Sequence, residues 1–138
     1  MKFNIIIAVA ATVFSTTLAS GAALAQASQK GIPGLYRTDV QRHDSSIPGY
    51  EVIQDRVDIE PGVVAPNHRH PGEEVVYVIE GALEYDLQGR PPAVLKAGDG
   101  LTVPAGVPHI VKNLGTSNGA ELGTYVVPKG KPLFELAP

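Results

Sequence analysis

Three histidines and an acidic pair are the residues of this sequence whose types and spacing could do chemistry. His68 and His70 stand two positions apart, and residues two apart on an extended strand point to the same face. Glu73 and Glu74 follow closely, and either carboxylate could join the two imidazoles. His109 follows a turn-rich corner and could close the site from a neighbouring strand. Because imidazole and carboxylate groups bind divalent transition metals, this arrangement predicts a metal chelate.

The choice between the two carboxylates stays open at this level, because Pro71 and Gly72 can bend the chain and disturb strand parity. His43 lies beside Asp44 in a polar stretch and is expected at the surface, unless an N-terminal arm folds over the pocket. Other chemistries find little support. Cysteine is absent, which excludes a thiolate site or nucleophile, and no Gly-x-Ser-x-Gly elbow or complete dinucleotide-binding glycine pattern is present.

Short strands separated by turns must position these side chains. Apolar residues alternate with polar ones over 53–59 and 83–87, which indicates half-buried strands, and the β-branched run 75–79 indicates another. Further strands are expected over 94–95, 101–103, 109–111 and 122–127, and no amphipathic helix is evident in 26–138. About eight short strands at such spacing predict an all-β sandwich or barrel.

Both histidine segments resemble the sequence motifs of the cupin superfamily. Residues 62–81 read GVVAPNHRHPGEEVVYVIEG, in which the outer glycines, the His-x-His pair and the second glutamate have the spacing of the first cupin motif. Residues 98–113 read GDGLTVPAGVPHIVKN, which has the spacing of the second motif. The chain therefore resembles a small, single-domain exported cupin (monocupin, cupin type-2). The fold that this resemblance implies is a double-stranded β-helix, or jelly-roll barrel, of one domain.

The resemblance also implies a ligand set and a cofactor. The family's metal ligands fall on His68, His70, Glu74 and His109, which leaves Glu73 outside the set. The motif's glycines, its proline and Asn113 have structural roles in the family. The implied cofactor is one divalent transition metal, and the ligand set admits Fe, Mn, Ni, Cu, Co or Zn. Neither the residues nor the resemblance assigns a catalytic side chain.

Several functions are compatible with this site. Cupins catalyse dioxygen insertion, isomerisation and decarboxylation, and some bind ligands without turnover. Few acid–base groups are evident beyond the ligand set, and this favours dioxygenase-like chemistry, in which the metal holds both reactants. A metal-dependent isomerase or lyase and a non-catalytic binding or sensing cupin are the alternatives. The resemblance implies a small-molecule ligand or substrate and a homodimer, with residues 30–50 as the arm exchanged between subunits.

The N-terminus is predicted to be a secretory signal peptide over residues 1–25. Lys2 precedes an apolar run, and Ala23-Leu24-Ala25 has the small-x-small pattern of a cleavage site. The alternative is a membrane anchor, but the run is shorter than the roughly 20 residues that span a bilayer. We expect export, to the periplasm in a Gram-negative source, and no membrane association after cleavage. The predicted organisation is signal peptide 1–25, N-terminal arm 26–49, barrel 50–129 and C-terminal tail 130–138.

Composition argues against nucleic-acid binding. The formal net charge is −3, the basic residues are scattered, and tryptophan is absent, so the sequence offers neither a basic footprint nor a set of stacking platforms.

Overall fold

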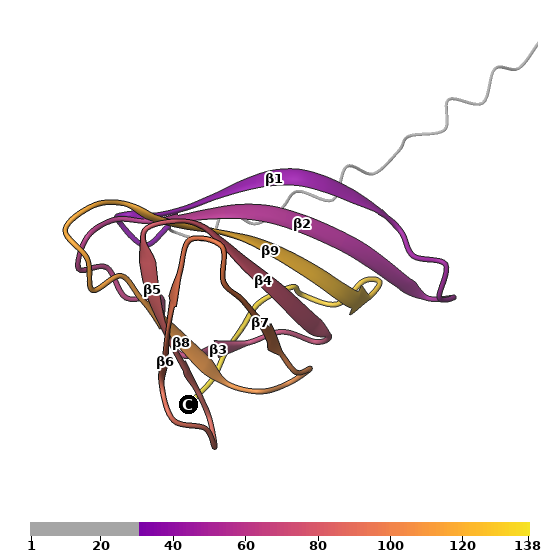
Figure 1. The fold of residues 1–138 in the computed structure, drawn as a ribbon. Coiled ribbons are helices and arrows are strands. Elements are labelled where there is room, and N and C mark those ends of the chain that lie inside the picture. The colour runs from indigo at the N-terminus through magenta and orange to yellow at the C-terminus, as the bar shows by residue number, and fades with distance from the viewer. Residues whose placement is uncertain (1–30) are drawn as a thin grey trace, which may run out of the picture.

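The computed structural model describes residues 31–138, and the predicted signal peptide lies outside the described residues. Within residues 31–138, ten strands form two five-stranded antiparallel sheets that face each other (Figure 1). Sheet A has the order β1 (Leu35–Asp44), β2 (Tyr50–Ile59), β9 (Gly119–Pro128), β4 (Glu73–Glu80) and β7 (Gly100–Val103). Sheet B has the order β10 (Glu135–Leu136), β3 (His68–Arg69), β8 (His109–Lys112), β5 (Ala82–Leu87) and β6 (Ala93–Lys96). The predicted all-β fold is confirmed.

The core lies between the two sheets and follows the alternation of the sequence. In β5, Leu83, Tyr85 and Leu87 are buried while the residues between them are half-buried. In β4, Val76 and Val78 are buried and their neighbours are exposed. This period of two is the geometry of strands with one face on a core. The main cluster has the following buried members: Val57, Ile59, Ala65, Val76, Val78, Leu83, Tyr85, Leu87, Val103 and Val111.

A close turn at Gly81 and a side-chain bridge from Asn113 fix connections between strands. Gly81 joins β4 of sheet A to β5 of sheet B with φ of +70°, and a Cβ there would lie 2.7 Å from the carbonyl oxygen of Asn118. Only glycine meets both demands at this corner. Asn113, also buried, donates through Nδ2 to the carbonyl oxygens of Ile59 and Ser117 at 2.7 and 2.9 Å. It therefore ties the end of β2 to the loop before β9.

Two strands fall in the segments predicted as an N-terminal arm and a C-terminal tail. β1 falls within the predicted arm 26–49 and pairs with β2 of the same chain along its length. It escapes prediction because it is an edge strand whose residues are almost all exposed, so its sequence lacks an apolar alternation. β10 falls within the predicted tail 130–138 and pairs with β3.

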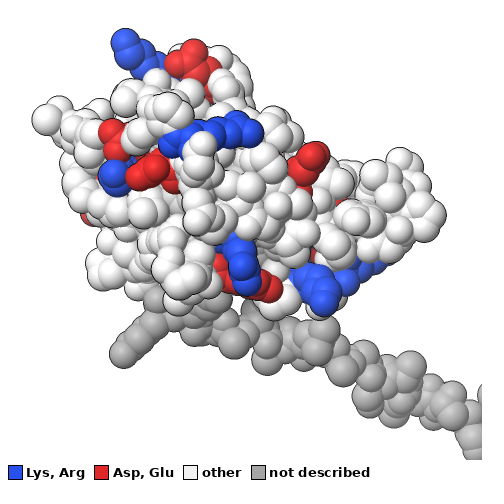
Figure 2. Space-filling model, turned by 90° about the horizontal axis from the view of Figure 1, so that it is seen from below, with Lys and Arg blue, Asp and Glu red and all other residues white. Residues whose placement is uncertain are grey.

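The described residues 31–138 contain no helix with the length and apolarity to cross a membrane. On the face shown in Figure 2, acidic and basic side chains are interspersed rather than gathered by sign.

Candidate metal centre

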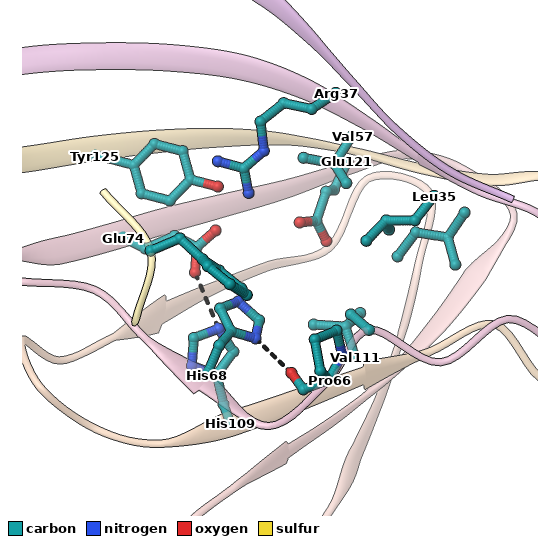
Figure 3. A pocket seen from close by; sticks show the side chains of 13 residues that line it. Leu35, Arg37, Val57, Pro66, His68, Glu74, His109, Val111, Glu121 and Tyr125 are labelled. Carbon is teal, nitrogen blue, oxygen red and sulfur yellow. Dashed lines mark hydrogen bonds and ion pairs between the residues drawn. The ribbon is translucent and has the colours of Figure 1, made fainter. Parts of the chain in front are cut away.

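Three strands and the loop after one of them bring four candidate ligands together. His68 lies on β3 directly opposite His109 at the start of β8, so sheet B supplies both imidazoles from adjacent strands. His70 follows β3, and Glu74 enters from β4 of sheet A. The ligand atoms of the three histidines lie within 4.8 Å of one another. All four side chains are buried. Figure 3 shows three of them, His68, Glu74 and His109, side by side.

Each imidazole is held by a backbone carbonyl. Nδ1 of His68 lies 2.7 Å from the carbonyl oxygen of Pro66, and Nδ1 of His109 lies 3.2 Å from that of Val107. Nδ1 of His70 lies 2.6 Å from the carbonyl oxygen of Leu133. A carbonyl only accepts, so each Nδ1 carries the proton and each neutral ring keeps the lone pair on Nε2. This is the second-sphere arrangement by which proteins orient metal-binding histidines.

The carboxylate of Glu74 completes the cluster. Its Oε2 lies 3.3 Å from Nε2 of His70 and 3.4 Å from Nε2 of His109. Oε2 of Glu74 and Nε2 of His70 are both buried without a hydrogen-bond partner among residues 31–138. Buried polar atoms are nearly always partnered, and here the unpartnered atoms are electron-pair donors that face each other. A shared cation satisfies all of them at once.

Electrostatics keep these groups in the states that a cation requires. Burial would raise the pKa of Glu74, but a proton on the adjacent imidazole of His109 or His70 stabilises the carboxylate, and this effect outweighs burial and holds that pKa below its ordinary value. Burial, with the neighbouring His109, lowers the pKa of His68 to about 4. Glu74 is therefore a carboxylate and His68 a neutral imidazole near pH 7.

A small cavity of about 30 Å³ opens beside these ligands. It is large enough for one or two water-sized groups. Its walls are mostly apolar, and its polar lining besides the ligands comes from Arg37, Glu121 and Tyr125 (Figure 3).

The comparisons with known proteins decide the family. The Cupin_2 family model, described as "Cupin domain", matches residues 55–128, more than half of the chain. The chain belongs to the cupin family. A likeness to an uncharacterized conserved protein with a double-stranded beta-helix domain from Klebsiella pneumoniae agrees with this. The TM-score is 0.64 at 23% identity over 80% of this chain and 90% of that one.

The curated relatives match shorter stretches of this cupin. A dimethylsulfoniopropionate lyase, DddQ, from Ruegeria pomeroyi is 37% identical over 51 residues, which cover 37% of this chain and 25% of the relative. Germin-like protein subfamily 2 member 2 from Arabidopsis thaliana is 34% identical over 87 residues, which cover 57% of this chain and 40% of the relative. The chain thus spans between a quarter and two fifths of the length of these relatives.

Within the cupin barrel, the four residues expected as ligands lie together. Glu73 is exposed on the other face of β4, so parity there separates it from Glu74. Tyr77, on the same face of β4 as Glu73, is also exposed. His43 lies on the exposed strand β1 and does not line the cavity. The three buried histidines could hold a metal ion, whose identity the site does not specify.

The polar lining of the cavity was not predicted. Glu121 on β9 is buried and accepts a hydrogen bond at Oε2 from the hydroxyl of Tyr85. Burial, together with the charge of Glu74, raises the pKa of Glu121 well above its ordinary value. Burial also raises the pKa of Tyr125, whose hydroxyl is hydrogen-bonded to Glu74. Glu121 and Tyr125 are therefore neutral groups that can hold a proton beside the ligands.

One feature of the sequence could have indicated the partner of Arg37, a residue of this lining. Asp55 falls on the parity of Ile53, Val57 and Ile59, the inward face of the strand predicted over 53–59. A charged residue on an apolar face indicates a buried polar partnership. In the structure Asp55 is buried and accepts a hydrogen bond from Arg37 at 3.2 Å.

The last residues of the chain also enter the site. The ring of Phe134 lies against that of His68, with centroids 4.9 Å apart, and the carbonyl of Leu133 is the one that holds His70. Asn67 donates through Nδ2 to the carbonyl oxygen of Pro138 at 2.8 Å, which fastens the end of the chain beside β3.

Proposed function

We propose that this cupin is a metal-dependent enzyme that acts on a small molecule. The observation that carries the proposal is the convergence of the lone-pair nitrogens of His68, His70 and His109 with the unpartnered Oε2 of Glu74. Such a set of imidazoles and a carboxylate suits a divalent transition metal. When bound, the metal would act as a Lewis acid and leave coordination positions for substrate.

The chain's own residues support proton transfer beside such a site. Glu121 lines the cavity with its pKa raised, and its neutral form can donate a proton while Tyr85 hydrogen-bonds the same carboxyl group. Tyr125 places a second hydroxyl against Glu74. General acid–base catalysis requires groups of this kind within reach of the substrate.

These groups change the weighing of the alternatives. The sequence favours oxygen chemistry because few acid–base side chains are evident in it. The cavity, however, contains at least two such side chains, Glu121 and Tyr125. A lyase or isomerase reaction is therefore the proposal that the cavity supports best, with dioxygenase-like chemistry as the second candidate. The partial similarity to a lyase from Ruegeria pomeroyi is consistent with the first choice.

The test combines metal analysis with two measurements on the same reaction. Purified protein is loaded in turn with Fe, Mn, Ni, Cu, Co or Zn and incubated with dimethylsulfoniopropionate, oxalate and other small carboxylates and diketones. Substrate loss is followed by NMR and dioxygen uptake by an electrode. Turnover without dioxygen uptake supports a lyase or isomerase, and turnover with uptake supports a dioxygenase. Ligands that bind and return unchanged with every metal would contradict enzymatic function and favour a binding or sensing protein.

We also propose that the protein is exported and forms a homodimer. Export rests on the predicted signal peptide. N-terminal sequencing of the protein recovered from the periplasm or the culture medium of its native cell tests it.

The argument for the dimer is an apolar patch on the outer face of β4. It consists of Val75, Tyr77 and Ile79, which are 47%, 50% and 36% exposed. Light scattering should give twice the chain mass for wild type and a smaller mass for Tyr77→Glu. A monomeric wild type would contradict the dimer.

A further inference from the structure

Arg37 is the cationic side chain at the mouth of the cavity. It lies on β1 opposite Val57 of β2, and it shares the inward parity of Leu35. Figure 3 shows its guanidinium between the side chains of Tyr125 and Glu121. Its side chain is 36% exposed while it lines the cavity, so one end meets solvent and the other meets the site.

The guanidinium is held in place from behind. Nη1 donates to Oδ2 of Asp55 at 3.2 Å, and the Asp55 side chain is only 2% exposed. The guanidinium carbon also lies 5.6 Å from the centre of the Tyr125 ring, within the range of a cation–π contact. Within residues 31–138, Asp55 is the one side chain that accepts a hydrogen bond from Arg37. A guanidinium has five N–H donors, so most of them remain for a ligand in the cavity.

The charges of the site favour an anion. A divalent cation and Arg37 together carry three positive charges, and the carboxylates of Glu74 and Asp55 carry two negative ones. Burial favours the neutral form of Glu121, so it adds no charge. A cavity with excess positive charge attracts and retains an anionic ligand.

We propose that Arg37 is a specificity-determining residue that binds the carboxylate of a small anionic substrate while the rest of that substrate faces the metal ligands. The inference rests on the proposed function and names its substrate class. Arginine suits this task because its planar fork binds a carboxylate through two parallel hydrogen bonds. The small volume of the cavity, about 30 Å³, favours a short acid.

The competing explanation is that Arg37 only neutralises the buried Asp55. Removing one partner of such a pair leaves an uncompensated buried charge and destabilises the fold. A loss of ligand affinity in Arg37→Gln alone could therefore result from a destabilised fold. The double variant Arg37→Gln/Asp55→Asn removes both charges, and it separates loss of the ion pair from loss of an anion site.

The experiment measures binding of acetate and of its uncharged counterpart, acetamide, by NMR titration. Both zinc-loaded and chelator-treated full-length protein are used. Wild type should bind acetate more tightly than acetamide. In Arg37→Gln and in the double variant, acetate should bind about 10- to 100-fold more weakly, because a charged hydrogen-bonded pair is lost, while acetamide is unaffected. Arg37→Lys should retain part of the preference.

The matched control is Arg42→Gln, which removes the same charge from the same strand but from a side chain that is 55% exposed and outside the cavity. It should bind acetate as wild type does, and zinc affinity should be the same in every variant. Equal affinity of wild type for acetate and acetamide would overturn the proposal, as would restored acetate binding in the double variant. Selective acetate loss in a protein without turnover would support Arg37 as an anion site and contradict only the proposed enzyme.

Discussion

In each histidine of the candidate centre, Nδ1 contacts a backbone carbonyl and Nε2 faces the site. The Nδ1 atoms of His68 and His109 contact carbonyls two residues earlier in the chain, just before β3 and β8, so the local backbone orients both rings. His70 instead contacts Leu133, which is 63 positions further along the chain. The first two orientations follow from short-range structure, whereas the third depends on how the chain ends.

A first prediction concerns the carboxylate. Glu74→Gln should lower metal affinity by more than about 100-fold, because loss of outer partners alone typically costs 10- to 100-fold. The metal-free variant should be less stable than wild type near pH 7, because the lowered pKa of Glu74 means that the fold stabilises its ionised carboxylate, which Gln cannot supply. Competition with a chromophoric chelator measures affinity. Glu73→Gln is the matched control, and affinity lost equally in both variants would contradict the assignment to Glu74.

A second prediction concerns pH in the metal-free protein. The pKa of His68 is about 4 in the folded state against an ordinary 6.5, so between these values the unfolded chain binds more protons. The free energy of unfolding contributed by His68 therefore falls as pH drops from 6.5 to 4, by at most about 3 kcal/mol. Glu121 contributes with the opposite sign because its pKa is raised.

The contribution of His68 to this pH dependence is measured as the difference between wild type and a variant that lacks the imidazole. Urea unfolding in a chelator at several values between pH 7 and pH 4 gives the slope for wild type, for His68→Gln and for His43→Gln. Wild type and His43→Gln should lose more stability over this range than His68→Gln, because His43 is exposed on β1. Equal slopes in all three proteins would show that His68 is not neutral in the fold.

At the scale of elements, the sequence predicts the central strands and fails at the edges. β2, β4, β5 and β9 have one buried face, and that burial imposes the alternation from which they were predicted. β1 has no such face, and its pairing with β2 is a backbone interaction that no side-chain pattern records. The ligand positions were predictable because their spacing is local or fixed by family motifs.

The rest of the cavity was not predictable in the same way. Arg37, Glu121 and Phe134 lie on β1, on β9 and in the segment before β10, elements far apart in sequence. Only the pairing of strands brings them to one place. A single sequence indicates such a residue only when the residue interrupts an apolar alternation, as Asp55 does. β1 and β10 have no apolar alternation that a polar residue could interrupt.

A third prediction tests the end of the chain as an element. Deleting residues 131–138 should lower metal affinity by about 10- to 100-fold, since His70 loses the carbonyl that fixes its ring. Phe134→Ala keeps that carbonyl and should have a smaller effect. Glu135→Gln removes only an exposed ion pair with Arg69 and should leave affinity unchanged. Wild-type affinity in the deletion variant would contradict a role for this segment.

At the scale of the whole molecule, the candidate centre joins the two layers of the barrel. Glu74 belongs to β4 of sheet A, whereas His68 and His109 belong to sheet B. A cation held by all three would link the sheets, in addition to the hydrogen bond from Tyr85 of sheet B to Glu121 of sheet A. Because the chain contains no cysteine, no disulfide can provide such a link.

The last prediction follows from this link. Metal that binds only the folded protein at about 100 times its dissociation constant stabilises it by about 2.7 kcal/mol. For a domain of roughly 100 residues, that corresponds to a rise in Tm of about 10 to 20 °C. Calorimetry of chelator-treated and metal-loaded protein measures the shift. His109→Ala should show almost none, because it removes one imidazole of sheet B, and Glu73→Gln should respond as wild type does. A Tm that is independent of every metal tested would mean that the four side chains meet for folding alone.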